Sequence, residues 1–248
     1  MKPILETAKM HFMGVPVNSK PRTIRTVFDE GSRLVFGSRV PDLAAAEQYR
    51  TIARRLRARF PQGAVFAVTS PAQGEGKTLT AANLALAFGE DAQSTLLVDM
   101  DLRCPAVHER LSIQFEPTIN KVLSGEATTM EAVRLLDGRN LHVCVAAVDA
   151  EPAKLVSRQN LETLVEELRE KFTYIVLDTP PIFPAGDILE VAGVSDAVLL
   201  VVREGHTEVS VLQRAMERLS GTLCGVILND SSLDDAAARY ASRYHQGS

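Results

Sequence analysis

The nine residues Ser70–Thr78 read SPAQGEGKT and stand between two apolar runs, AVFAVT (64–69) and LTAANLALAF (79–88). A glycine-rich segment that follows a buried strand and opens a helix is the context of a phosphate-binding loop. The usual pattern, G-x-x-x-x-G-K-S/T, has a glycine where this chain has Pro71. Because position 71 precedes the part of the loop that wraps a β-phosphate, we expect the loop to keep its function.

The residues after Pro71 predict how a nucleotide would be held. Gly74 and Gly76 let backbone N–H groups approach phosphate oxygens in conformations that a β-carbon would hinder. The start of the following helix adds partial positive charge. We expect Lys77 to neutralise the β- and γ-phosphates and the Thr78 hydroxyl to bind Mg²⁺. The cofactor-binding residues predicted in this segment are Gly74, Glu75, Gly76, Lys77, Thr78 and Leu79.

Two further apolar runs end in acidic residues, LLVDMDLRCP (96–105) and YIVLDTPP (174–181). Side chains alternate along a strand, so Asp99 and Asp101 are expected on the same side. Ligands of open α/β sheets bind at the carboxyl ends of the strands. Asp99, Asp101 and Asp178 are therefore expected to converge on one magnesium nucleotide. The alternative is that Asp99 and Asp178 only cap strands or helices.

Apolar runs and helix-like segments alternate over the rest of the chain. Runs rich in Val, Ile and Leu fit strands that are buried on both faces of a parallel sheet. The pattern predicts an α/β fold, a P-loop NTPase with a mostly parallel central sheet flanked by helices on both faces. The expected strands are 64–70, 95–99, 141–146, 174–178, 196–202 and 223–229. The expected helices are 44–60, 77–89, 159–172, 185–193 and 208–220.

These segments divide the chain into three parts. Residues 1–45, broken by four prolines, are expected to form a poorly patterned arm that is extended or partly disordered. Residues 46–230 form the predicted P-loop domain. Residues 231–248 are polar and are expected to form a flexible tail.

Composition excludes several classes of protein. The net charge of −4 argues against a surface that mainly binds nucleic acid. The three cysteines, Cys104, Cys144 and Cys224, are far apart and have no metal-ligand spacing. No apolar stretch approaches the ~20 residues that span a bilayer, so we expect no direct membrane insertion. The first residues have no continuous apolar segment typical of a secretory signal.

The three motifs together resemble those of the bacterial tyrosine kinases of capsule and exopolysaccharide assembly, of the cytoplasmic type. The resemblance runs from about Glu47 to Asn229 and includes AEQYR (46–50), KVLSGEAT (121–128) and GVILND (225–230). It implies a protein-tyrosine autokinase that uses ATP and Mg²⁺. The catalytic residues that it implies are Lys77, Asp99, Asp101 and Asp178, with Asp99 activating the attacking tyrosine hydroxyl. It assigns Mg²⁺ to Thr78, Asp101 and Asp178, and further cofactor contacts to Arg103 and Asn229.

The chain departs from the family pattern at three places. Cys104 stands where the family often has a basic residue, and we expect a small, partly buried cysteine rather than a reactive thiol. The family's ring-forming helix reads E-x-x-R-x-x-R, but the third position here is Ala53, with Arg54 one residue later. The family's C-terminal tyrosine cluster is reduced to Tyr240 and Tyr244, which we predict to be the phosphate acceptors.

The resemblance also implies partners and a location. It implies a transmembrane polysaccharide co-polymerase as activator, a homo-oligomer, and a cytoplasmic protein recruited by its partner to the inner face of the cell membrane. Two alternatives remain open. One is a nucleotide-gated scaffold without kinase activity. The other is a partition or positioning ATPase, against which the absence of a signature lysine at Ala72 counts.

Overall fold

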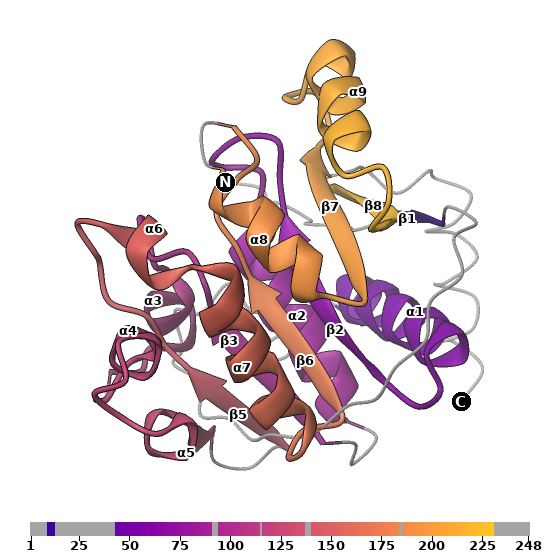
Figure 1. Cartoon of the computed structure of the whole chain (residues 1–248). Helices are drawn as coiled ribbons and strands as arrows, with labels where there is room; N and C mark the ends of the chain where they lie inside the picture. The colour runs from indigo at the N-terminus through magenta and orange to yellow at the C-terminus, as the bar shows by residue number, and fades with distance from the viewer. Residues whose placement is uncertain are drawn as a thin grey trace.

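The structure, a computed structural model, describes residues 9–12, 43–90, 94–114, 116–136, 140–183 and 186–230. Within these residues it has eight strands, all in one sheet, and nine helices (Figure 1). The strands are β1 (Lys9–Phe12), β2 (Ala64–Thr69), β3 (Thr95–Asp99), β4 (Arg134–Leu136), β5 (Leu141–Cys144), β6 (Tyr174–Asp178), β7 (Ala197–Arg203) and β8 (Leu223–Asn229). The helices are α1 (Leu43–Arg59), α2 (Lys77–Gly89), α3 (Val107–Leu111), α4 (Ile119–Leu123), α5 (Thr129–Ala132), α6 (Pro152–Leu155), α7 (Arg158–Arg169), α8 (Asp187–Val194) and α9 (Val209–Arg218).

The sheet has the strand order β1-β8-β7-β2-β6-β3-β5-β4. The six strands from β8 to β5 are parallel, and the two edge strands, β1 and β4, are antiparallel to their neighbours. Asp99 at the end of β3 lies in register with Asp178 at the end of β6. The carboxyl ends of these strands and the loop that follows β2 therefore meet at one edge of the sheet, as ligand sites of α/β proteins require.

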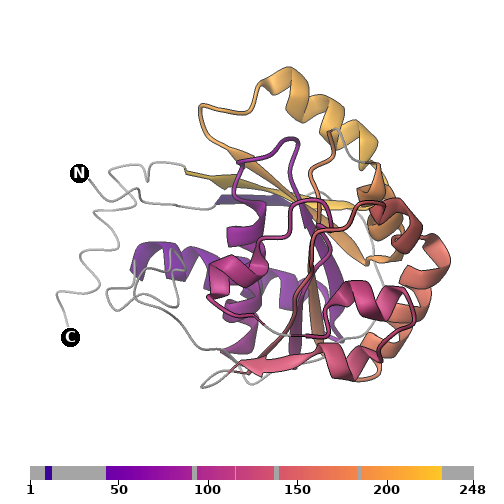
Figure 2. The same cartoon turned by 90° about the vertical axis from the view of Figure 1, so that its left-hand side faces the viewer.

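Helices cover both faces of the sheet. Figures 1 and 2 show α1 and α2 on one face and α7 and α8 on the other. Every residue of α2 is buried, because this helix lies between the sheet and α1. Burial on all sides explains why the segment after the phosphate loop is apolar almost all round. The predicted P-loop α/β fold is confirmed.

Aromatic rings join α2 to the middle of the sheet. Phe66 of β2 stacks on Phe88 of α2 with ring centroids 5.5 Å apart, and Phe88 stacks on Tyr174 of β6 at 4.5 Å. Such pairs contribute about 0.5–1.5 kcal/mol each beyond the area that they bury. The Arg57 guanidinium of α1 donates to the carbonyls of Ala87 (3.0 Å) and Phe88 (2.8 Å), which lie at the end of α2. These contacts fix the helix that follows the phosphate loop.

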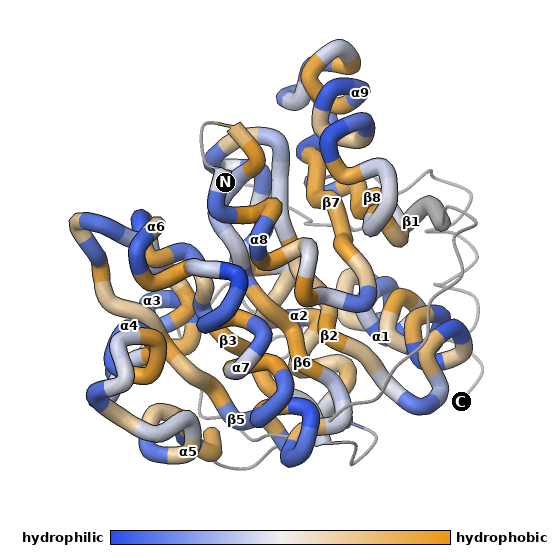
Figure 3. Tube along the Cα trace, in the orientation of Figure 1, coloured by the Kyte–Doolittle hydropathy of each residue, from blue (hydrophilic) through white to orange (hydrophobic). Residues whose placement is uncertain are grey.

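The hydropathy of the chain follows this layering. The central strands are apolar along their length, whereas α7 and α9 alternate between apolar and polar residues (Figure 3). In α7 the buried residues are Leu161, Leu164, Val165 and Leu168, the face that the sequence predicts. In α9 only Ala215 is fully buried.

Several elements differ from the sequence-based expectation. Residues 9–12, within the predicted arm, form β1 and pair with residues 225–228 of β8. Helix α1 begins at Leu43, so the expected domain boundary at residue 46 falls inside this helix. The short helices α3 to α6 and strand β4 were not expected. The predicted tail, with Tyr240 and Tyr244, lies outside the described residues.

Among the described residues, no helix is long and apolar enough to cross a membrane.

Candidate active site

The phosphate loop runs from the end of β2 to the start of α2, as the sequence predicts. Gly74 and Gly76 have φ angles of +86° and +92°, in the left-handed region that favours glycine. Gly76 immediately precedes α2. The loop therefore brings the N-terminal end of a buried helix, with its unpaired N–H groups, to the site.

Pro71 is accommodated because the start of the loop is held through carbonyl groups. The N–H of Ile182 donates to the carbonyl of Ser70 (2.8 Å), and the N–H of Phe183 donates to the carbonyl of Pro71 (3.1 Å). A proline supplies a carbonyl acceptor as well as a glycine does, and only its N–H is missing. The departure from the usual pattern thus leaves the loop anchored to the segment after β6.

Glu75 anchors the other end of the loop. The residue is 2% exposed, and its carboxylate accepts hydrogen bonds from the N–H of Arg203 (2.7 Å), at the end of β7, and from the hydroxyl of Thr207, in the segment that follows. The side-chain amide of Asn229 donates to the carbonyl of Glu75 at 3.0 Å. The Glu75 side chain therefore ties the loop to the ends of β7 and β8 and does not line the cavity, although the sequence placed it with the cofactor-binding residues.

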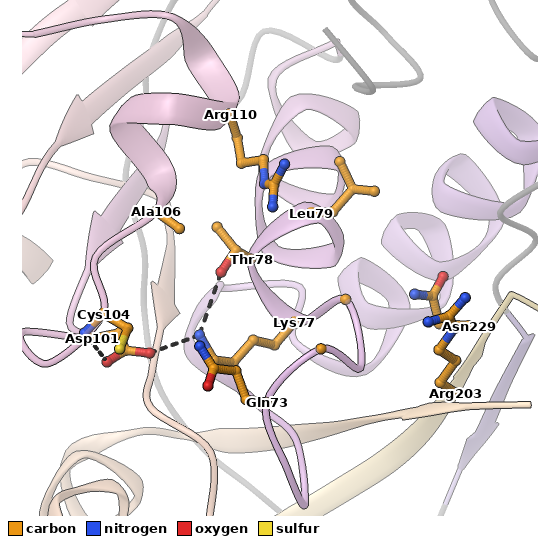
Figure 4. A pocket seen from close by; sticks show the side chains of 12 residues that line it. Gln73, Lys77, Thr78, Leu79, Asp101, Cys104, Ala106, Arg110, Arg203 and Asn229 are labelled. Atoms are coloured by element: carbon orange, nitrogen blue, oxygen red, sulfur yellow. Dashed lines mark hydrogen bonds and ion pairs between the residues drawn. The ribbon is translucent and has the colours of Figure 1, made fainter. Parts of the chain in front are cut away.

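A cavity of about 320 Å³ opens beside the loop (Figure 4). Seven of the predicted site residues line it, namely Gly74, Gly76, Lys77, Thr78, Leu79, Asp101 and Asn229. Four predicted site residues, Glu75, Asp99, Arg103 and Asp178, do not. The lining residues that the sequence reasoning missed are Gln73, Cys104, Ala106, Arg110 and Arg203.

Lys77 lies against carboxylates. Its Nζ is 2.8 Å from Asp101 Oδ2, 4.0 Å from Asp178 Oδ1 and 3.4 Å from the Thr78 hydroxyl. Burial alone would lower the pKa of Lys77, but attraction to Asp178 and Asp101 outweighs burial and raises it. The Lys77 ammonium group is thus charged and lies in the cavity beside the phosphate loop.

Asp99 lies behind the cavity wall. Its Oδ2 accepts from the N–H groups of Ala106 and Val107, both at 3.0 Å, and its Oδ1 accepts from the N–H of Asp101 at 3.1 Å. Burial, together with the neighbouring charge of Asp178, raises the pKa of Asp99 to about 8, although the three N–H groups act in the opposite sense. In this structure Asp99 shapes the turn that presents Asp101, and Asp101 is the carboxylate that reaches the cavity.

Asp178 is the group that best tests the fit of a metal ion. It is fully buried, and the groups beside its carboxylate in the described chain are the Lys77 ammonium, 4.0 Å from Oδ1, and the Thr78 hydroxyl, whose hydrogen bond lowers the pKa of Asp178. Burial raises its pKa to about 6, with Lys77 acting in the opposite sense. The buried carboxylate of Asp178 lies beside Lys77, and the Thr78 hydroxyl and Asp101 lie close to the same amine. Together they form an oxygen-rich set of the kind that Mg²⁺ and its bound waters require. These residues fit the ion.

The arginine predicted to contact the cofactor is engaged elsewhere. Arg103 is exposed, and its Nε and Nη2 both lie 2.8 Å from Oδ2 of Asp187, at the start of α8. Cys104 beside it is exposed, so the expectation of a partly buried thiol was wrong. The turn after Asp101 directs Arg103 away from the cavity, while α3 brings Arg110 to it. Side chains alternate along the strand but not in this turn, so neither placement could be predicted from the sequence pattern.

Comparison with known proteins agrees with this geometry. The family model described as "AAA domain" matches residues 63–220. The chain is 32% identical to the tyrosine-protein kinase YwqD of Bacillus subtilis (strain 168) over 83% of this chain and 90% of that protein. It is 31% identical to the tyrosine-protein kinase CpsD of Streptococcus pneumoniae serotype 4 over 79% of this chain and 88% of that protein.

A solved structure extends the likeness to three dimensions. The kinase domain of VpsO superimposes with a TM-score of 0.69 at 30% identity, covering 75% of this chain and 95% of that domain. The residues matched by the family model, 63–220, include the phosphate loop and both acidic strand ends. The site and these relatives together show that the chain belongs to the bacterial tyrosine kinase family, whose catalytic domain is a P-loop NTPase fold and not the eukaryotic kinase fold.

Proposed function

We propose that this kinase uses Mg-ATP to phosphorylate tyrosines of its own C-terminal tail, and that it serves capsule or exopolysaccharide assembly together with a transmembrane partner. The observation that carries the proposal is the meeting of Lys77, Thr78 and Asp101 in one cavity, with the buried carboxylate of Asp178 4.0 Å from Lys77 Nζ. Phosphoryl transfer depends mostly on positioning and on neutralising charge, and this set of groups supplies both.

The loop and its neighbours would hold ATP and Mg²⁺ as follows. The backbone of Gly74 and Gly76 and the ammonium of Lys77 bind the phosphates. Thr78 and Asp178 hold Mg²⁺ directly or through water, and Asp101 reaches the ion only through a bound water. The ion, when bound, neutralises charge on the β- and γ-phosphates. Arg103, paired with Asp187, is left out of this contact set.

Asn229 is suited to select the base. Its Nδ2 donates a hydrogen bond to the carbonyl of Glu75, and this contact fixes the orientation of the amide. Its Oδ1 is buried and has no hydrogen-bond partner among the described residues. A fixed acceptor matches the exocyclic amino group of adenine and opposes the carbonyl of guanine. We therefore assign Asn229 to adenine.

We assign the carboxylate that receives the tyrosine hydroxyl to Asp101, and a positioning role to Asp99. The family resemblance gives the activating role to Asp99, but the two oxygens of Asp99 accept three backbone N–H groups and lie outside the cavity. Asp101 lines the cavity and contacts Lys77. A candidate base must come within hydrogen-bond reach of the proton that it accepts, and Asp101 meets this condition better.

The acceptors proposed are Tyr240 and Tyr244. The chain has four tyrosines. Tyr49 is 1% exposed and Tyr174 is 3% exposed, so neither can enter a neighbouring site without local unfolding. From Asn229, the fifteen residues to Tyr244 span up to ~50 Å when extended, enough to reach another subunit.

The proposed assembly is a homo-oligomer recruited to the inner face of the cell membrane by a transmembrane polysaccharide co-polymerase. The α1 residues that resemble the family's ring helix are already engaged within the chain. Arg50 forms two hydrogen bonds to Glu90, at 2.7 and 2.9 Å, and Arg54 pairs with Glu47. Ala53 is buried and Arg54 is exposed, so Arg54 is the one of these two residues that a neighbouring molecule could contact. An oligomer through α1 would therefore use a shifted set of contacts.

One experiment tests the proposal. The purified full chain is incubated with Mg-ATP, with and without the cytoplasmic tail of a candidate partner, and phosphosites are mapped by mass spectrometry. We expect phosphate on Tyr240 or Tyr244, more of it with the tail present, and none in Lys77→Met or in the variant with both tyrosines changed to Phe. ATP binding without phosphotyrosine in any mixture would favour the nucleotide-gated scaffold.

A further inference from the structure

Three of the described residues that line the cavity carry positive charge, and they differ in how that charge is neutralised. Lys77 Nζ lies 2.8 Å from Asp101 Oδ2. Arg203 Nε donates to Asp230 Oδ2 at 2.6 Å. The guanidinium of Arg110 forms no hydrogen bond or ion pair with any residue that the structure describes. Arg110 is therefore the cation of this cavity that is available to a ligand without first leaving a carboxylate.

Arg110 reaches the cavity from α3. Figure 4 shows its guanidinium directed toward the start of α2, at Thr78 and Leu79. The side chains that precede it along the cavity wall, Cys104 and Ala106, carry no charge. Burial raises the pKa of Asp178, and the charge of Arg110 is among the smaller effects that lower it, which is consistent with this placement.

A second cation would favour the binding of a polyphosphate in this cavity. Asp101, Asp99 and Asp178 gather within or behind one wall, and Lys77 is the only ammonium among the described residues that lies against them. A polyphosphate that binds beside these carboxylates is repelled by their negative charge, and the single positive charge of Lys77 offsets that repulsion only in part. A guanidinium is always charged and presents paired N–H donors that match two phosphate oxygens.

We propose that Arg110 binds the phosphate chain of the nucleotide as a second cationic ligand, in addition to Lys77. The inference rests on the proposed function, because it assigns a further residue to the same nucleotide site. Lys77 must exchange its contact with Asp101 for a contact with phosphate, whereas Arg110 has no such contact to lose. Arg110 thus binds the phosphate chain without giving up an existing ion pair.

The test measures nucleotide affinity directly. Binding of Mg-ATP and Mg-ADP is measured by calorimetry for the full chain and for Arg110→Gln, Arg110→Lys and Arg158→Gln. Arg158 is a matched control, because it is an exposed arginine of α7 paired with Glu162 and does not line the cavity. Thermal unfolding without nucleotide is recorded for each variant to show that it is folded.

We expect Arg110→Gln to weaken both nucleotides about tenfold, the loss of one charge-assisted contact. Arg110→Lys should recover part of this loss, Arg158→Gln should match the unaltered chain, and a higher salt concentration should reduce the difference. Affinities for Arg110→Gln within twofold of the unaltered chain would overturn the inference, and so would a change confined to the KM for a tyrosine acceptor. If the unaltered chain and the control bind neither nucleotide, the proposed function itself fails.

Discussion

A β-carbon on Gly76 would lie 2.1 Å from Nδ2 of Asn229, a residue 153 positions later in the chain at the end of β8. The glycine before Lys77 is thus required by a side chain on a distant strand as well as by its own φ of +92°. The Asn229 amide occupies that space because it donates to the carbonyl of Glu75. The phosphate loop and the proposed adenine contact are therefore built as one unit.

Changing Gly76 to Ala should abolish nucleotide binding. The substitution combines a left-handed backbone with a collision that displaces Asn229. Gly74→Ala is the matched control, because Gly74 has a similar φ of +86° but nothing within 4 Å of the added carbon. Calorimetric titration with Mg-ATP should show a much larger loss for Gly76→Ala. Equal losses in the two variants would mean that the contact with Asn229 has no influence on binding.

Changing Lys77 to Met should weaken Mg-ATP binding at least tenfold. The variant keeps the bulk of the side chain but removes a charge-assisted contact worth about 1.5–3 kcal/mol. It also leaves Asp101 without the amine that now lies 2.8 Å away. The same titration measures the change, and an unaltered affinity would contradict the assignment of the site.

Asp101→Asn should lose kinase activity, whereas Asp99→Asn should lose stability. Asp101→Asn keeps a polar group in the cavity wall, so we expect a folded protein that binds nucleotide and forms no phosphotyrosine. Asp99→Asn turns an amide toward three N–H donors that now meet a carboxylate. Losing one of these buried contacts costs about 1–3 kcal/mol, which thermal unfolding should detect. A fully stable but inactive Asp99→Asn would return the activating role to Asp99.

Changing Glu75 to Ala should loosen the phosphate loop without removing a nucleotide ligand. The N–H of Arg203 and the hydroxyl of Thr207 would lose their common acceptor. We expect weaker nucleotide binding together with a lower unfolding temperature, whereas Lys77→Met removes a phosphate ligand and should leave residues 203–207 unaffected. Hydrogen exchange of residues 203–207 should rise in Glu75→Ala, and unchanged exchange there would contradict the anchoring role.

The nucleotide-free protein should become less stable as pH rises from about 4 to about 8. Burial and mutual repulsion raise the pKa of Asp99 from 3.8 to about 8, and burial raises that of Asp178 from 3.8 to about 6. Between these values the folded state binds more protons than the unfolded state, so the free energy of unfolding falls as pH increases. Urea unfolding at several pH values measures the slope. Asp178→Asn should flatten it, and an identical slope in that variant would contradict the coupling of the two carboxylates.

The sheet and the phosphate loop could be predicted from the sequence because their signals are local. The runs that became β2, β3, β5, β6, β7 and β8 are continuous, apolar and bounded by polar residues. By contrast, α3 to α6 have four or five residues each, too few to show a helical period. Strand β1, with the sequence KMHF, has no apolar pattern, and its pairing with β8 depends on contacts more than 200 residues apart in the chain.

The candidate site was predictable where the family motif coincides with a strand end or with the loop. Lys77, Thr78 and Asp101 come from such positions and meet in the cavity. Glu75 and Arg103 belong to the same motifs, but their side chains do not line the cavity. Glu75 accepts a hydrogen bond from Thr207, and Arg103 pairs with Asp187. A motif therefore predicts which segment forms the site. Which of its side chains line the cavity depends on hydrogen bonds to residues far away in the sequence.

The pairing of β1 with β8 has a practical consequence for recombinant versions of this kinase. A version that begins at residue 43 would keep the phosphate loop and every residue of the cavity wall, yet it would lack the strand that covers residues 225–228. The backbone N–H and carbonyl groups along that side of β8 would then form an open sheet edge, which invites pairing between identical molecules. Aggregates or dimers of such a shortened protein would therefore result from the missing strand. Measurements of the natural assembly require residues 9–12 to be present.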